Sequence, residues 1–99
     1  MKMADIRAHA LSLEAVTEAP HHTYSSFRVR DKIFVTLPPE ETHLHVFLDE
    51  EDREQALAMY PAFVEKLFWG SKVLGLRITL AQATPGVVKA LVTKAHETR

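Results

Sequence analysis

Cysteine is absent from this sequence of 99 residues, which excludes disulfide bridges, thiolate nucleophiles, zinc ribbons and iron–sulfur clusters. Long hydrophobic runs are also absent. No stretch approaches the roughly 20 apolar residues of a membrane-spanning helix, and polar side chains interrupt the N-terminal segment before it reaches the length of a signal-peptide core. We therefore expect a cytoplasmic protein with no membrane-spanning segment.

Glycine is scarce, with three residues, and a content of 46% hydrophobic and 25% charged residues is typical of a globular chain. The length suits one domain, so residues 1–99 are expected to fold as a single unit. The net charge is only −1, but it is divided unevenly. Residues 40–54 hold seven acids and one base, whereas the rest of the chain holds six acids and eleven bases. This division predicts a basic surface if the fold keeps the acidic segment apart.

Residues 23–37 predict a β-hairpin, because two runs rich in aromatic and β-branched side chains flank Asp31. Asp31 suits a tight turn, since its short polar side chain tolerates left-handed geometry. The two-residue period of a strand turns Phe27 and Val29 inward and leaves Arg28 on the other face. The inward side chains of the second strand are then expected to be Ile33, Val35 and Leu37.

The rest of the chain predicts an α+β fold with an antiparallel four-stranded sheet, helices mainly on one face, and the order α-β-β-β-α-β-α. Residues 17–22 are expected to form a loop, because Pro20 cannot donate a hydrogen bond and restricts its neighbour. Residues 61–72 are expected to be a helical continuation or a packed loop. The other elements are expected as follows: helix 3–13, strand 43–48, helix 50–59 after the N-cap Asp49, strand 73–80 with Leu74, Leu76, Ile78 and Leu80 inward, and a final helix after Thr84 and Pro85.

Several local signatures recur together in one order. They are TEAPHH at 17–22, SFRVRDKIF at 26–34, YPAF at 60–63 and WG at 69–70. Taken together they resemble the MmcQ/YjbR family of small bacterial proteins. The resemblance implies a DNA-binding protein with an α+β fold related to the CyaY/frataxin-like arrangement, whose exposed hairpins act as wings on the nucleic acid. Asp31 departs from the glycine that is usual at the hairpin turn, and it adds a negative charge there.

Basic residues in the hairpin are the candidate DNA contacts. Arg28, Arg30 and Lys32 lie within five positions, and Lys72 and Arg77 extend the set. Such side chains bind phosphates by an electrostatic attraction that weakens with salt. The alternative is a solvated strand edge whose charges discourage pairing with another chain. With the resemblance, we expect a monomer that binds DNA weakly, largely without sequence preference.

Histidines and aromatic residues suggest the alternative function, a small-molecule or metal-binding module. Its candidate ligand contacts are His21, His22 and Trp69. A zinc site normally needs three or four converging ligands, and no such spacing is present, so we expect no metal and no cofactor. No nucleophile elbow or phosphate-binding glycine loop is present either, so we expect no enzymatic activity. A protein-interaction module is a third possibility.

Overall fold

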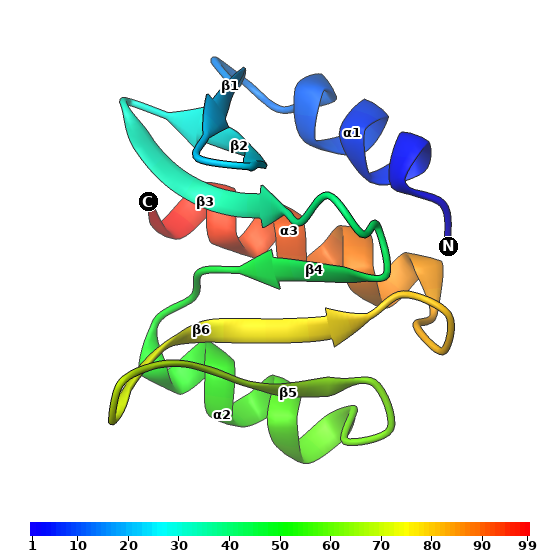
Figure 1. Ribbon diagram of the computed structural model, residues 1–99. Helices are drawn as coiled ribbons and strands as arrows, with labels where there is room; N and C mark the ends of the chain where they lie inside the picture. Colours follow the sequence, from blue (N-terminus) through cyan, green and yellow to red (C-terminus); the bar gives the residue numbers. More distant parts are fainter.

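The computed structural model describes residues 1–99 as one antiparallel sheet of six strands and three helices (Figure 1). Across the sheet the strand order is β1-β2-β3-β4-β6-β5. The α+β class is as predicted. Along the chain the elements are α1 Met3–Ser12, β1 Thr17–His21, β2 Tyr24–Val29, β3 Lys32–Leu37, β4 His43–Val46, α2 Glu50–Met59, β5 Val64–Trp69, β6 Lys72–Thr79 and α3 Pro85–Thr98.

The helices form one layer against the sheet. Helix α3 packs on β3 and β4, α2 packs on β5, and α1 packs beside α3 (Figure 1). The core lies between this layer and the sheet, and it includes the fully buried Phe27, Val46 and Val88. The opposite face of the sheet carries no helix. None of the three helices is both long and apolar enough to cross a membrane.

The predicted four-stranded sheet is wrong, because two segments form additional strands at the two edges. The predicted loop at 17–22 contains β1, which pairs with β2 from Thr17 opposite Arg28 to His21 opposite Tyr24. Pro20 is tolerated there because an edge strand needs hydrogen bonds on only one side. The segment expected as helix or packed loop contains β5, which pairs with β6. The order along the chain is therefore α-β-β-β-β-α-β-β-α.

Two β-bulges change which side chains face the core. Phe27 pairs with Val35 and Arg28 with Ile33, so Phe34 is an extra residue in β3. Phe34 is fully buried beside His96 of α3, whereas Ile33, expected inward, is only half-buried. The other inward predictions for this hairpin, Phe27, Val29, Val35 and Leu37, are buried.

The second bulge lies in β6. Leu67 pairs with Gly75 and Phe68 with Val73, which leaves Leu74 as the extra residue. Leu74 is 41% exposed, so the prediction that it shares the core face with Leu76 is wrong. The bulge turns this leucine to the uncovered face of the sheet.

The three helices agree with their sequence patterns. Met3, Ile6 and Ala10 of α1 are buried, as are Val88, Val92 and Ala95 of α3. Asp49 stands at the N-cap of α2 and Pro85 at the first turn of α3, as predicted. Neither Asp49 nor Thr84 donates or accepts a side-chain capping bond, so these helices depend mainly on their packing.

Both long hairpins turn at the same end of the sheet. Strands β3 and β6 each run antiparallel to β4, so both start from one end, and their tips are residues 30–31 and 70–71. Arg30 and Asp31 have φ values of 51° and 62°, and positive φ at both positions is the mark of a type I′ turn. The left-handed geometry predicted for Asp31 is therefore confirmed.

Candidate binding site on the open sheet face

A polar row crosses the face of the sheet that no helix covers. In register across five strands the row consists of Ser26, Thr36, His45, Arg77 and Glu65. Thr36 Oγ1 lies 3.3 Å from His45 Nδ1, and the Arg77 guanidinium lies 3.7 Å from the Glu65 carboxylate. Thr36 and His45 thus form one polar pair and Arg77 and Glu65 another, while Ser26 at the β2 end of the row is fully buried.

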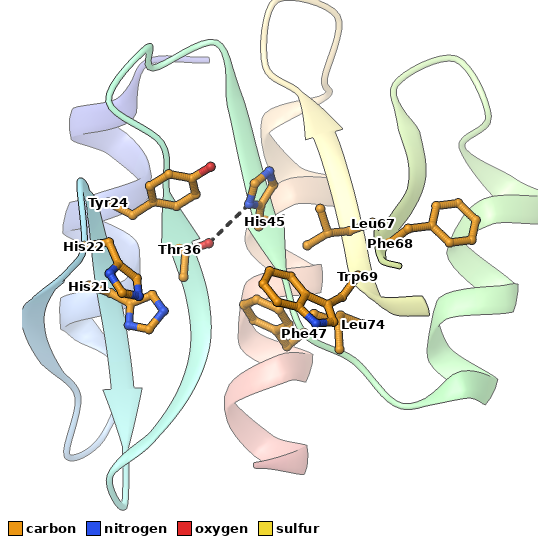
Figure 2. A pocket seen from close by; sticks show the side chains of 10 residues that line it. All are labelled: His21, His22, Tyr24, Thr36, His45, Phe47, Leu67, Phe68, Trp69 and Leu74. Atoms are coloured by element: carbon orange, nitrogen blue, oxygen red, sulfur yellow. Dashed lines mark hydrogen bonds between the residues drawn. The ribbon is translucent and has the colours of Figure 1, made fainter. Parts of the chain in front are cut away.

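Beside this row lies a pocket of about 410 Å³ whose walls are mostly aromatic or apolar (Figure 2). One wall comes from the β1–β2 hairpin, and Thr36 and His45 of the polar row lie between it and the opposite wall, where Phe47 and Leu74 lie near Trp69. The Phe68 ring points away from the others. The ten lining residues are His21, His22, Tyr24, Thr36, His45, Phe47, Leu67, Phe68, Trp69 and Leu74.

Local backbone geometry brings these side chains to the open face. Trp69 is the last residue of β5, immediately before the tip at Gly70, and its side chain is 75% exposed. Leu74 joins it because of the bulge in β6. On the other wall, His22 begins the β1–β2 turn with a φ of 58°. Large apolar groups gathered on an uncovered face indicate a contact surface.

The surroundings of His45 in the pocket lower the pKa of its imidazole. Burial lowers the pKa of His45 below 6.5, the positive charges of Arg77 and His43 lower it further, and Glu40 acts in the opposite direction. The imidazole is therefore neutral at pH 7. Nδ1 pairs with Thr36, and Nε2 makes no hydrogen bond within the protein, so Nε2 is available to a ligand.

The histidines of the pocket lie beside other aromatic rings. The His21 and His22 rings meet edge to face at 4.8 Å between centroids, and Tyr24 lies 5.9 Å from the ring of His45. No group of three histidine, cysteine or carboxylate side chains converges on a common point. The arrangement resembles an aromatic slot more than a ligand set.

Comparison with known proteins identifies the family. The YjbR family model matches residues 11–98. The chain belongs to the YjbR family. No curated protein matches the sequence.

Among solved structures, this YjbR-family chain is similar to the crystal structure of Deinococcus radiodurans protein DR2400, which has a DUF419 domain. That match has a TM-score of 0.79 at 16% identity and covers 97% of this chain and 77% of the other, so it shows a shared fold. The expected relationship to the CyaY/frataxin-like arrangement stays a prediction.

The predicted DNA contacts of this YjbR-family protein occupy four places. Arg30 and Lys32 are exposed at the tip of the β2–β3 hairpin, and Lys72 is exposed at the tip of the β5–β6 hairpin. Arg28 is half-buried, and its Nε donates to Ser26 Oγ at 3.2 Å. Arg77 lies in the polar row with Glu65. Arg30, Lys32 and Lys72 are therefore the residues free to contact a ligand.

Arg99 is a cation that the sequence did not indicate as part of a site. Its Nε donates to the backbone oxygen of Ile33 at 2.8 Å, and its guanidinium carbon lies 5.7 Å from the centre of the Phe47 ring. Arg99 therefore stands between the β2–β3 hairpin, called the basic hairpin below because it carries Arg30 and Lys32, and the open-face pocket. Only the packing of α3 against β3 brings it there, so no local pattern marked it.

The residues of the alternative ligand site lie together. His21, His22 and Trp69 all line the one pocket, although 47 positions of sequence separate His22 from Trp69. Sequence patterns did not indicate three further members, namely Tyr24, His45 and Phe47. The two-residue period put His45 and Phe47 on one face of their strand, which was the available signal.

Proposed function

We propose that this YjbR-family protein binds DNA weakly and with little sequence preference, and that it acts as a monomer by binding rather than by catalysis. The cations at the hairpin end of the sheet are the proposed contacts. Phosphate contacts of this kind carry no sequence information themselves, which accounts for the low preference.

The observation that carries this proposal is a group of cations without acidic partners at one end of the sheet. Arg30, Lys32, Lys72 and Arg99 have no carboxylate within 4.0 Å, whereas Arg77 is paired with Glu65. The two hairpin tips share this end of the sheet, and Arg99 lies near the first of them through its hydrogen bond to Ile33 O. Asp31 at the first tip opposes them with one negative charge.

Salt dependence tests the proposal quantitatively. If three or four cations each neutralise one phosphate of a duplex, the slope of log K against log salt is about −2.7 to −3.6. Affinity then falls by about 40- to 150-fold between 50 and 200 mM salt. Fluorescence anisotropy with a short labelled duplex measures it.

Charge variants identify the surface. Arg30→Glu with Lys32→Glu should abolish binding at low salt, and Asp31→Asn should strengthen it. Lys89→Glu with Lys94→Glu is the matched control, because it makes the same charge change at exposed positions on α3. Absence of duplex binding at 50 mM salt, or equal weakening by both double variants, refutes the proposal.

Ligand binding in the open-face pocket is a second candidate function, favoured by the meeting of His21, His22 and Trp69 in one cavity. Its volume lies within the range typical of small-molecule sites, and its walls are mainly apolar with a few polar groups. Thermal shift with a set of metabolites and single metal ions tests it. A stabilising compound whose effect is lost in Trp69→Ala supports this candidate, and no shift with any compound counts against it.

A further inference from the structure

We infer that the open-face pocket accepts one unpaired nucleobase, so that single-stranded DNA is the preferred form of the ligand. The inference rests on the proposed DNA binding and adds which form of DNA is bound and where a base goes. The basic hairpin alone makes no such distinction, because phosphates are available in both forms.

The walls of the pocket suit a flat ring. Phe47 and Trp69 line one wall, Tyr24 and the two adjacent histidines line the other, and the Trp69 ring is largely in solvent (Figure 2). Proteins that bind single strands commonly stack bases on exposed aromatic side chains of a sheet. A buried core role does not account for a tryptophan with 75% of its surface exposed.

Between these walls lie polar groups that fit the edge of a base. His45 is a neutral imidazole whose Nε2 is free, since Thr36 occupies Nδ1 at 3.3 Å. A neutral ring can donate or accept at that nitrogen according to its tautomer. Bases present both donors and acceptors on their edges, so His45 can form a hydrogen bond with any of the bases and the pocket has little base preference.

Cations stand where the phosphates beside an inserted base would pass. Arg99 lies 5.7 Å from the Phe47 ring, and Lys72 is paired directly with Trp69 across the β5–β6 hairpin. Each of the two rings therefore has a cation at its side. Arg77 is adjacent to His45 across the sheet, and its ion pair with Glu65 is exposed and weak.

Other occupants fit less well. An intact duplex keeps its bases inside the stack, so a base must first be extruded before it can reach these rings. A second copy of the chain docked on this face would bring together two surfaces that both carry Lys72 and Arg99, which like-charge repulsion disfavours. A single strand supplies both the ring and the negative charge.

Trp69 is the only tryptophan, so its fluorescence reports on the pocket alone. The experiment titrates the full chain with an oligothymidylate of eight nucleotides, an abasic oligomer of equal phosphate count, and a duplex of eight base pairs. We expect quenching by the oligothymidylate and none by the abasic strand. Anisotropy should show tighter binding of the oligothymidylate than of the duplex at the same salt.

Variants separate the pocket from the basic hairpin. Trp69→Ala should weaken oligothymidylate binding by about 5- to 150-fold, the range for one stacked base, and leave duplex binding within about twofold. Met59→Ala is the control, since Met59 is 58% exposed on the helical layer. Thymidine monophosphate serves as a probe of the pocket whose binding does not require the basic hairpin.

The outcomes distinguish this inference from the proposed function. Duplex binding with no quenching by any strand, or oligothymidylate affinity unchanged in Trp69→Ala, overturns the base pocket while leaving the basic hairpin in place. Quenching by thymidine monophosphate without duplex binding keeps the pocket and overturns the hairpin. Self-association that Trp69→Ala abolishes, with oligothymidylate affinity unchanged, assigns the face to a second copy and overturns the inference.

Discussion

Replacement of Gly75 by alanine tests the close packing that holds β4 against β6. A Cβ atom at Gly75 would lie 2.5 Å from the backbone oxygen of Val46 and 3.2 Å from Phe47. Val46 O belongs to the neighbouring strand, so relief requires a shift of backbone rather than rotation of a side chain. The strand would have to move by about half an ångström to reach the 3.0 Å minimum for such contacts.

The expected effect follows from two opposing terms. Overpacking of this kind costs about 1–3 kcal/mol, and the lower backbone entropy of alanine in the unfolded chain returns about 0.4–1 kcal/mol. We expect Gly75→Ala to lower the free energy of unfolding by about 1.3 kcal/mol net, which lowers the Tm by about 5–10 °C for a domain of this size. It should also displace Phe47 and so weaken binding in the open-face pocket.

The other two glycines supply matched comparisons. A Cβ at Gly70 or Gly86 meets no atom within 4 Å, but Gly70 has a φ of +61°. Gly70→Ala should therefore cost about 1 kcal/mol through left-handed strain, whereas Gly86→Ala in the first turn of α3 should be neutral or stabilise by up to about 1 kcal/mol.

Urea unfolding followed by far-ultraviolet circular dichroism measures all three. Fluorescence is unsuitable, because Trp69 is already 75% exposed in the folded state. A Gly75→Ala variant within about 0.5 kcal/mol of the parent, the usual range for unconstrained surface positions, would refute the reasoning about this contact.

Two further predictions concern the polar row. The pKa of His45 is lowered mainly by burial, so the imidazole binds a proton more readily in the unfolded chain. The contribution of neutral His45 to the free energy of unfolding is therefore fully present above pH 6.5 and decreases as the pH falls below it. A Tm that does not fall on acidification from pH 7 to 5, or that falls as steeply in His45→Gln, contradicts this. Ser26→Ala removes a buried hydroxyl that donates to the Ala19 oxygen at 2.7 Å, and should cost about 1–2 kcal/mol by thermal unfolding. Ser25→Ala, which affects only an exposed bond to Glu18, should cost less than about 0.5 kcal/mol, and equal costs for the two serines argue against the role of Ser26.

The elements predicted correctly are those with an uninterrupted period. Helix α3 has a proline at its start and an apolar stripe over three turns, and β4 alternates cleanly through Leu44 and Val46, so local pattern and packing agree. Strand β5 was missed because its residues 64–69 place two charges before three consecutive large apolar side chains, a sequence with no two-residue period. Strand β1 was missed because Pro20 is a loop signal everywhere except at a sheet edge.

Parts of the site followed from sequence and parts depended on tertiary structure. Trp69 and the two adjacent histidines were expected together as a ligand site, and they do share a pocket. Leu74 could not be assigned to it, since a bulge shifts a strand by one residue and reverses the face without a local signal in this sequence. Arg99 depended on the docking of a helix 66 positions away from Ile33 in sequence.

The two edge strands also govern how this sheet meets other chains. Strands β1 and β5 each pair on one side only, so their outer edges present backbone groups that another extended chain could extend into a continuous sheet. Pro20 offers no backbone donor on the first edge, and Glu65 with Lys66 puts exposed charges of both signs on the second. The exposed rings of Phe68 and Trp69 therefore lie in a strand whose neighbouring charges disfavour fibrillar stacking, so an exposed apolar surface is tolerated at this open sheet edge.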